Sequence, residues 1–433
     1  MLIYLLRLIT NPTHVLLVIH KKYGDFIHTR FFNKTLVFVS NADYFQEIFS
    51  LEGRGSVNRD SLYQAKLTMF GNGLFNSKGD VWANQRKLMQ PVFSKKVIGV
   101  WQDIILEEAN IAVTRIEGLS HQEVNFSREI KAAVQKILIR LMFNSASSEK
   151  PDELLMRCVD VILEGLFPHF VTATLGKGRL KHLFFIRNRR MNKAVNYFKA
   201  YVEAEIQRKR GETEKLGLLA MMMDSLDKDG NGMTDQLLND ETVTLFLAGQ
   251  DTTVNTLIWF FYLLGKNPDQ QRRVIDEIKR LSELTLTLEN IGQFKYTHAA
   301  LYESMRLYPQ AIALSRDAIL PITLGGKELP TGTTLIMNIV ESHRSPVYWE
   351  KPDQLYPEHF LNKQDRHKFA FIPFGAGMHS CIGRHLAEYE MMLIIITFLS
   401  RISVKTNLDV KPALSITLKP ERDVILSATK INS

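Results

Sequence analysis

One segment indicates the fold and the chemistry of this chain most clearly: Phe371-Ile-Pro373-Phe374-Gly375-Ala-Gly377-Met378-His379-Ser380-Cys381-Ile382-Gly383-Arg384. Its two glycines, Gly375 and Gly377, permit a tight loop before Cys381, and the apolar periodicity that follows predicts a helix over 382–400. The electropositive start of a helix lowers the pKa of a nearby thiol, so we expect Cys381 to be a thiolate that can ligate a metal. The only other cysteine, Cys158, lies inside a helical pattern and is predicted to be an inert core residue.

The longest uninterrupted helical pattern covers residues 235–265 and contains the polar cluster Ala248-Gly249-Gln250-Asp251-Thr252-Thr253. A glycine within a helix costs about 1 kcal/mol, and a buried carboxylate or hydroxyl needs a hydrogen-bonding partner. Ala248 and Thr252 are four residues apart and share one face, and the Thr252 hydroxyl can donate to the carbonyl of residue 248 and loosen the helix. A simple kink does not account for a carboxylate and a hydroxyl beside a glycine, so the cluster favours a functional role.

Most of the remaining chain is predicted to be helical because its apolar residues recur at helical spacing. Predicted helices cover 97–118, 128–143, 151–167, 187–209, 269–281 and 298–308. The β-branched and aromatic runs at 27–32 and 35–40 predict a hairpin, and further strands are expected at 322–324 and 333–340. No linker or repeat divides the chain, so the predicted fold class is mainly α with a smaller β-rich lobe, in one domain over residues 1–433.

The composition excludes several classes of protein. The 433 residues are 45% apolar and 23% charged, which excludes a disordered chain. Two cysteines can form at most one disulfide bond, too few to stabilise a secreted fold of this size, so a cytoplasmic protein is expected. The apolar runs are too short to cross a bilayer, and no transmembrane anchor is expected, although the apolar segment Met1–Ile9 leaves a surface contact with a membrane open. The net charge of +8 does not by itself distinguish nucleic acid, anionic lipid and an acidic protein as partners.

Several motifs are absent or incomplete. The sequence has no G-x-G-x-x-G, no G-x-x-x-x-G-K-[ST] and no C-x-x-C-H motif, so we expect neither a fused reductase nor c-type haem attachment. The segment Asp227-Lys-Asp229-Gly-Asn231-Gly232 opens like a calcium-binding EF-hand loop. Position 12 of that loop needs a bidentate glutamate, whereas Leu238 stands there, so we predict an exposed turn before the long helix.

The ligand loop resembles that of the cytochrome P-450 haem-thiolate monooxygenases, whose pattern is F-x-x-G-x-[RH]-x-C-x-G. Phe374, Gly377, His379, Cys381 and Gly383 match its fixed positions. The resemblance implies haem b, with Cys381 as the axial thiolate of the iron, Phe374 close to the sulfur and His379 near a haem propionate. It also implies that dioxygen lies in a groove at Ala248 and Gly249, and that Asp251 and Thr252 relay protons to it.

Two further elements stand in the family's order along the chain. Glu303-Ser-Met-Arg306 alone would most often be a surface ion pair, but it matches the family's E-x-x-R signature, which is buried and structural. The third partner in the family is an arginine, and His359 replaces it here. Trp82-Ala-Asn-Gln-Arg86 matches a helix whose Trp and Arg bind one propionate. Arg316 stands where a second propionate-binding arginine is usual.

The resemblance implies a monooxygenase that inserts one atom of O₂ into a small apolar substrate, with a fatty acid or a terpenoid favoured. Substrate contacts are expected from the loop region 54–80, from the turn at 420–423 and from four residues, Leu245, Phe246, Ala311 and Ile312. The alternatives are a peroxide-driven hydroxylase and a non-catalytic haem-binding sensor on the same fold. The pair of Asp251 and Thr252 argues against the first alternative.

Because no flavin or nicotinamide motif is present, electrons are expected from a separate ferredoxin or flavodoxin with its reductase, and no nucleic acid is expected to bind. The partner is expected to dock near Cys381. The docking residues are predicted to be basic: Lys87, Lys95, Lys96, Lys363, Arg366, His367, Lys368 and Arg384.

Overall fold

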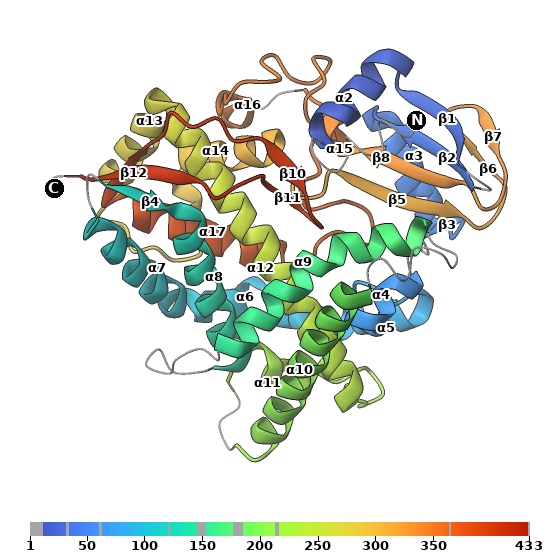
Figure 1. The fold of residues 1–433 in the computed structure, drawn as a ribbon, viewed down its shortest axis with the longest axis horizontal. Helices are drawn as coiled ribbons and strands as arrows, with labels where there is room; N and C mark the ends of the chain where they lie inside the picture. The colour runs from blue at the N-terminus through green and yellow to red at the C-terminus, as the bar shows by residue number, and fades with distance from the viewer. Residues whose placement is uncertain are drawn as a thin grey trace.

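A sheet at one end of the molecule and a large body of helices make up the fold (Figure 1). The computed structural model describes residues 12–31, 34–59, 63–119, 122–144, 153–175, 185–212, 216–362 and 365–431. The apolar segment Met1–Ile9, a candidate for surface contact with a membrane, lies outside these residues. No helix among the described residues is long and apolar enough to span a membrane.

The helices form the body of the molecule. In chain order they are α2 Pro12–Tyr23, α3 Ala42–Gly53, α4 Tyr63–Phe70, α5 Gly79–Met89, α6 Lys95–Ile98, α7 Gln102–Glu117, α8 Phe126–Phe143, α9 Glu153–Leu175, α10 Phe185–Arg210, α11 Leu218–Met223, α12 Asp235–Lys266, α13 Pro268–Arg280, α14 Lys295–Leu307, α15 Ile339–Ser342, α16 Glu358–Leu361 and α17 Arg384–Leu399. At 1.5 Å per residue, the 32 residues of α12 extend over about 48 Å. Figure 1 shows α12 crossing the middle of the helical body.

Within the part of the chain that the structure describes, the strands form one larger sheet and three small ones. The larger sheet has the order β1-β2-β8-β5-β3. Its strands are β1 Phe26–Phe31, β2 Lys34–Val39, β8 Thr334–Asn338, β5 Ala313–Ala318 and β3 Val57–Asn58. Only β2 and β8 pair in parallel. The small sheets contain β4 Glu123–Asn125 with β12 Ile425–Lys430 and β9 Ile402–Lys405, β6 Ile322–Leu324 with β7 Lys327–Leu329, and β10 Pro412–Leu414 with β11 Leu418–Pro420.

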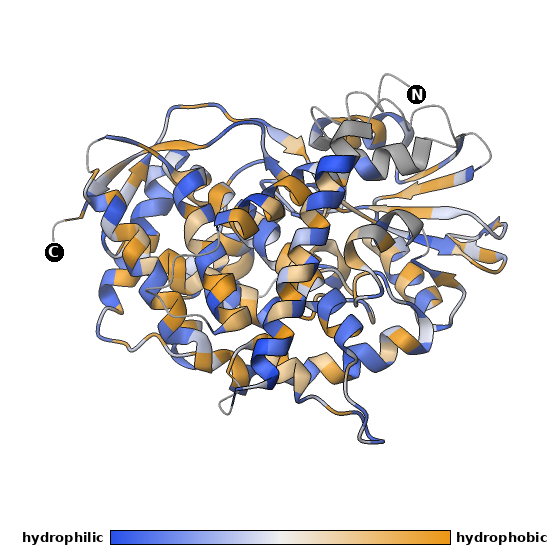
Figure 2. Cartoon of the chain, turned by 60° about the horizontal axis from the view of Figure 1, so that its bottom comes forward, coloured by the Kyte–Doolittle hydropathy of each residue, from blue (hydrophilic) through white to orange (hydrophobic). Residues whose placement is uncertain are grey.

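The core lies mainly between the central helices. Many residues in the second half of α12 and along α17 are buried, among them Trp259, Phe261 and Leu393, and a second cluster fills the space under the larger sheet. Figure 2 shows hydrophobic and hydrophilic residues alternating along most helices, the pattern of helices with one buried and one exposed side. The predicted fold class, mainly α with a smaller β-rich lobe, is confirmed.

The predicted helices are confirmed, but several of their limits were wrong. The pattern over 97–118 contains the short helix α6 and a 3-10 turn before α7, and α9 extends to Leu175 rather than ending at 167. Strand β8 ends at Asn338 because the Asn338 side chain accepts a hydrogen bond from the Glu341 amide and so caps α15. The calcium-like segment is the predicted exposed turn, in which the Asp227 carboxylate accepts bonds from the amides of Asp229 and Asn231.

Candidate functional site

Cys381 closes a tight loop just before α17. The Cys381 amide donates to the Phe374 carbonyl at 2.9 Å, and the Gly375 amide donates to the Ile372 carbonyl at 3.0 Å. Gly375 and Gly377 have φ of +69° and +70°, a conformation that favours glycine. A Cβ on Gly377 would also lie 3.0 Å from the Phe49 ring, so both the backbone and the packing require glycine there.

The Cys381 thiol is exposed to solvent, whereas Cys158 is buried, and neither cysteine takes part in a disulfide. The protein atoms crowded around the loop raise the pKa of the Cys381 thiol above its ordinary value. The Gly383 backbone and the guanidinium groups of Arg86 and Arg384 act in the opposite direction. The prediction that the helix start gives Cys381 a lowered pKa was therefore wrong for the protein alone, because desolvation by the protein atoms around the loop outweighs the effects of the helix start and the nearby cations.

A cationic cluster surrounds a single carboxylate beside this loop. Arg316, in β5, donates to both oxygens of Glu52 at 2.6 and 3.0 Å. His379 Nδ1 lies 2.7 Å from Glu52 Oε1. Burial alone would raise the pKa of Glu52, yet the bonds from His379 and Arg316 hold it below its ordinary value. Sequence reasoning missed Glu52, which lies 264 residues from Arg316.

Two more arginines belong to this cluster. Arg86 lies on α5 and donates to the Ser380 carbonyl at 2.9 Å, and the Trp82 ring on the same helix lies 4.0 Å from the His379 ring. Burial, together with Arg316 and Arg86, lowers the pKa of Arg59 to about 10. Three guanidinium groups and one imidazole therefore lie in this cluster, and its carboxylate, Glu52, bonds to Arg316 and His379. Arg59 lies in the region 54–80 that was expected to contact substrate, and its role was not foreseen.

The polar cluster of α12 adopts the predicted local geometry. Thr252 Oγ1 donates to the Ala248 carbonyl at 2.7 Å. A Cβ on Gly249 would lie 3.2 Å from Leu138 of α8, so the glycine allows the two helices to approach closely. Ala248 is exposed although it lies near the middle of the central helix.

Asp251 has a different environment from Thr252. Its Oδ2 accepts a short hydrogen bond from Thr417 Oγ1, and its Oδ1 accepts one from Asn255 Nδ2 at 3.2 Å. Burial raises the pKa of Asp251 above its ordinary value, while these bonds and nearby Lys419 act in the opposite direction. Thr417 was not foreseen as a partner of this carboxylate.

The loop that leads into α5 is tied to α12 by two acids. The Asn72 amide donates to Asp240 Oδ2 and the Leu74 amide donates to Glu241 Oε2, both at 2.9 Å. Burial raises the pKa of Glu241 to about 8, so this carboxyl is largely neutral at pH 7. These contacts fix the start of the helix that carries Trp82 and Arg86.

Glu303 and Arg306 form a buried pair rather than a surface one. Arg306 Nη2 and Nε bind the two Glu303 oxygens at 2.6 and 2.9 Å, and Arg306 Nη1 also donates to the His343 and Pro352 carbonyls. His359 Nδ1 lies 3.1 Å from Glu303 Oε1. His359 thus contacts Glu303 as a third partner of the pair, and all three side chains are almost fully buried.

The residues expected to contact substrate do not share one environment. Leu245, Ala311 and Ile312 are half-buried. Phe246 is fully buried and packs edge-to-face on Phe198 of α10, at 5.3 Å between ring centroids. Core packing therefore accounts for Phe246 without a substrate contact.

Comparison with known proteins identifies the family of this chain. The Cytochrome P450 family model matches residues 1–429, so the chain belongs to that family. A cyclooctat-9-en-7-ol 5-monooxygenase from Streptomyces melanosporofaciens is 27% identical over 79% of this chain and 75% of its own length. Cytochrome P450 4V2 of Mus musculus is 28% identical over 81% of this chain and 72% of its own length. A taurochenodeoxycholic 6 alpha-hydroxylase from Sus scrofa is 24% identical over 92% of this chain and 82% of its own length.

The protein is therefore a cytochrome P-450 monooxygenase, an oxidoreductase that uses haem b with a cysteine thiolate ligand, O₂ and a redox partner. The residues present fit this cofactor. An accessible cysteine lies in a rigid loop, and the adjacent cationic cluster holds more positive charge than Glu52 neutralises. Such a cluster suits the two carboxylates of a haem.

Proposed function

We propose that Cys381 is the axial ligand of the haem iron, and that Arg59, Arg86, Arg316 and His379 hold its propionates together with Trp82. The observation that carries this proposal is the position of His379 and Cys381 in one glycine loop, with His379 inside the cationic cluster. Phe374 belongs to the same loop, and the Arg384 guanidinium lies 5.4 Å from the centroid of its ring. Bound haem supplies the redox chemistry that divides O₂, while the protein holds the haem and delivers protons.

Asp251 and Thr252 form the proposed proton-delivery pair beside the groove at Ala248 and Gly249. A carboxyl whose pKa is raised by burial keeps its proton at higher pH than an ordinary aspartate, which suits a proton donor. The Thr252 hydroxyl, bonded to the Ala248 carbonyl, lies on the exposed face of the helix. The pair distinguishes this proposal from a peroxide-driven hydroxylase or a haem sensor, neither of which needs protons delivered to O₂.

Replacing Thr252 by Ala should leave O₂ consumption intact but reduce product formed per reductant roughly tenfold, because protons then reach the wrong oxygen or arrive from water. Asp251→Asn should slow turnover as a whole. Stoichiometry of reductant, O₂, peroxide and product measures both effects. If both variants couple reductant to product as the wild type does, the pair has no role in proton delivery.

The substrate proposed is an apolar molecule of fatty-acid or terpenoid type. Two relatives are named for a cyclooctatenol and for a bile-acid conjugate, each with a large hydrocarbon body. Leu245, Ala311 and Ile312 offer apolar, half-buried contacts. Titration of a library of fatty acids, terpenoids and steroids, measured as a change in haem spin state, tests the substrate class; binding confined to polar molecules would contradict it.

An acidic ferredoxin or flavodoxin is the proposed electron donor, docking on the surface beside Cys381. Lys87, Lys95, Lys96, Lys368 and Arg384 are exposed. A Cβ on Gly383 would lie 3.8 Å from Phe93, which places the segment before α6 against the ligand loop. A cytoplasmic location also stays a proposal, since it rests on the cysteine content.

Two residues of the expected docking set, Arg366 and His367, are not fully exposed. Arg366 is half-buried, and its guanidinium lies 3.9 Å from the Trp349 ring centroid, so it is not a free docking charge. His367 is also half-buried, and its Nε2 lies 3.5 Å from Asp43 Oδ1. Lys363 lies outside the described residues.

Charge reversal at Lys87 and Lys95 should slow haem reduction by an acidic donor roughly threefold or more at low salt, because the attractive field is weakened. Raising the salt concentration should slow haem reduction in the wild type and reduce the difference in rate between the wild type and the charge-reversal variants. Stopped-flow reduction measures the rate, with Lys279→Glu on α13 as the exposed control. Equal rates at low and high salt for the wild type would contradict electrostatic docking.

A further inference from the structure

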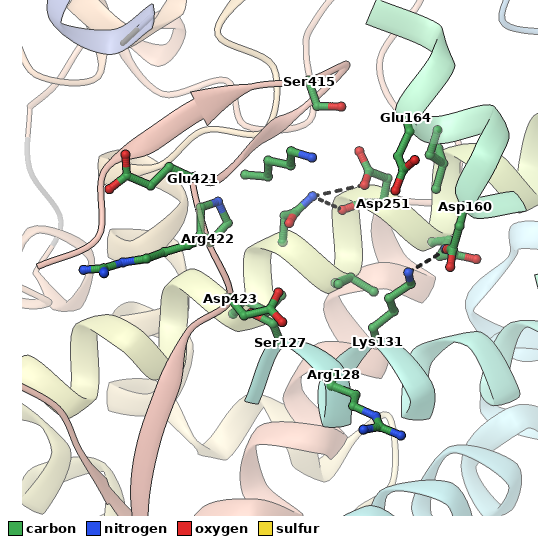
Figure 3. A pocket seen from close by; sticks show the side chains of 17 residues that line it. Ser127, Arg128, Lys131, Asp160, Glu164, Asp251, Ser415, Glu421, Arg422 and Asp423 are labelled. Atoms are coloured by element: carbon green, nitrogen blue, oxygen red, sulfur yellow. Dashed lines mark hydrogen bonds and ion pairs between the residues drawn. The ribbon is translucent and has the colours of Figure 1, made fainter. Parts of the chain in front are cut away.

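A polar cavity of about 420 Å³ lies on the side of α12 where Asp251 stands. It is lined by residues of α8, α9 and α12, of the β10–β11 hairpin and of the segment after β11, and it is partly open to solvent. Figure 3 shows the Asp251 carboxylate at this cavity, between the β10–β11 hairpin and the acids of α9. At roughly 30 Å³ per molecule, the cavity has room for several waters.

The lining of the cavity is charged but balanced. Its cationic side chains are Arg128, Lys131, Lys419 and Arg422. Besides Asp251, its acidic side chains are Asp160, Glu164, Glu421 and Asp423. The Lys131 ammonium lies 2.7 Å from Asp160 Oδ1. Because neither sign of charge predominates, the lining does not select an ionic ligand.

The cavity contains a buried acceptor that no described residue satisfies. Gln250 lines the cavity, its side chain is 1% exposed, and its Oε1 has no hydrogen-bond partner among the described residues. Buried amide oxygens of this kind are normally bonded to a donor, so Gln250 Oε1 keeps a bonding position that no described residue fills. The cavity that Gln250 and Asp251 line is itself partly open to solvent.

Thr417 joins Asp251 to the hairpin at the edge of this cavity. The Thr417 hydroxyl donates to Asp251 Oδ2 and accepts from Asn255 Nδ2 at 3.0 Å, so its direction is fixed from both sides. The hairpin is itself held in place by two hydrogen bonds at Leu418. Trp259 Nε1 of α12 donates to the Leu418 carbonyl at 2.9 Å, and the Leu418 amide donates to the Gln310 carbonyl at 3.3 Å. Gln310 directly precedes Ala311 and Ile312, two of the proposed substrate contacts.

We propose that Thr417 is the positioning residue of the proton-delivery path: its hydroxyl holds the Asp251 carboxylate at the end of the water-accessible cavity and ties it to the β10–β11 hairpin. This inference rests on the proposed role of Asp251 as proton donor. The cavity supplies a proton from solvent for each proton that Asp251 passes on. Asp251 then returns to its starting protonation state after each delivery.

The sign of the expected pH effect follows from the hydrogen bond. The Thr417 hydroxyl donates to the charged form of Asp251 and therefore acts to lower its pKa against the effect of burial. Thr417→Val removes this bond and should raise the pKa of Asp251 further. The carboxyl then stays protonated to higher pH, by about one pH unit.

Infrared difference spectra of the haem-loaded protein test the proposal directly. The Asp251 carboxyl band is assigned by its loss in Asp251→Asn and is titrated with pH in the wild type, Thr417→Val and Thr417→Ser. We expect a higher midpoint in Thr417→Val and a midpoint near that of the wild type in Thr417→Ser. The pH at which product per reductant declines should move in the same direction.

Thr397→Val is the matched control, since Thr397 and Thr417 are both 6% exposed and Thr397 lies on α17. It should leave the midpoint unchanged, and Thr417→Ala serves as a second test if the valine variant folds poorly. An unchanged Asp251 midpoint in the Thr417 variants would overturn the proposal. If Asp251→Asn formed as much product per reductant as the wild type, the proton-donor role of Asp251 would be refuted. The infrared midpoints of the Thr417 variants would still show whether Thr417 positions Asp251.

Discussion

Replacement of Cys381 by Ser is expected to abolish oxygenation and to change the absorption spectrum of the haem-loaded protein. A serine hydroxyl is far less acidic and far less electron-donating than a thiolate, so the electron density that promotes cleavage of O₂ is lost. The side chain is exposed, so the substitution removes no core packing. Turnover should fall by several orders of magnitude, to the level of free haem, measured as product formed with a competent redox partner.

Cys158→Ser is the matched control for this prediction. Cys158 lies in α9 and is buried, whereas Cys381 lies in the glycine loop. The control should retain the wild-type spectrum and turnover per folded molecule. Equal loss of activity in both variants, or wild-type turnover in Cys381→Ser, would remove Cys381 from its proposed role.

Replacement of Arg306 by Leu should prevent the accumulation of folded, haem-loaded protein. Arg306 and Glu303 are fully buried, and Arg306 also donates to the carbonyls of His343, Pro352 and Gln354. Removing one partner of such a pair leaves a buried carboxylate uncompensated and costs about 3–5 kcal/mol. That cost is a large fraction of the stability of an ordinary domain.

Denaturant unfolding and the yield of haem-loaded protein measure the effect. The exposed pair of Arg115 and Glu129 supplies the comparison, because Arg115→Leu removes a similar ion pair at the surface. It should cost at most about 1 kcal/mol. Similar losses of unfolding free energy in Arg306→Leu and Arg115→Leu would show that burial does not determine how much the Glu303–Arg306 pair stabilises the protein.

The sequence predicted elements well where the pattern is local. The helix expected over 235–265 is α12 almost to the residue, and the bond from Thr252 to the Ala248 carbonyl follows from their spacing of four. The short strands and single-turn helices were harder to predict, because their limits depend on individual caps. The side chain of Asn338, which ends β8 and begins α15, is one such cap.

The parts of the site that escaped prediction depend on contacts between distant segments. Glu52 binds Arg316 across 264 residues, and Thr417 binds Asp251 across 166. No periodicity relates such residues. The spacing of Glu303 and Arg306 alone is typical of a surface pair, whereas the family resemblance predicted a buried one, as observed. The carbonyls of the 343–354 segment that enclose the guanidinium were not predicted.

The pKa of Cys381 shows a further limit of local reasoning. The position of the thiol before a helix predicts a lowered pKa, but desolvation by the protein atoms around the loop has the larger effect. Sequence gives the neighbours along the chain, whereas the desolvation of a group depends on everything packed around it.

The difference spectrum of the reduced, carbon monoxide-bound protein tests the central claim most directly. Thiolate and imidazole ligands give clearly different absorption bands in this state, so the spectrum reports the axial ligand itself. We predict the thiolate-type band for the wild type and for Cys158→Ser, and its absence in Cys381→Ser. An imidazole-type band in the folded wild type, or a thiolate-type band that persists in Cys381→Ser, would contradict the assignment of Cys381 as the haem ligand.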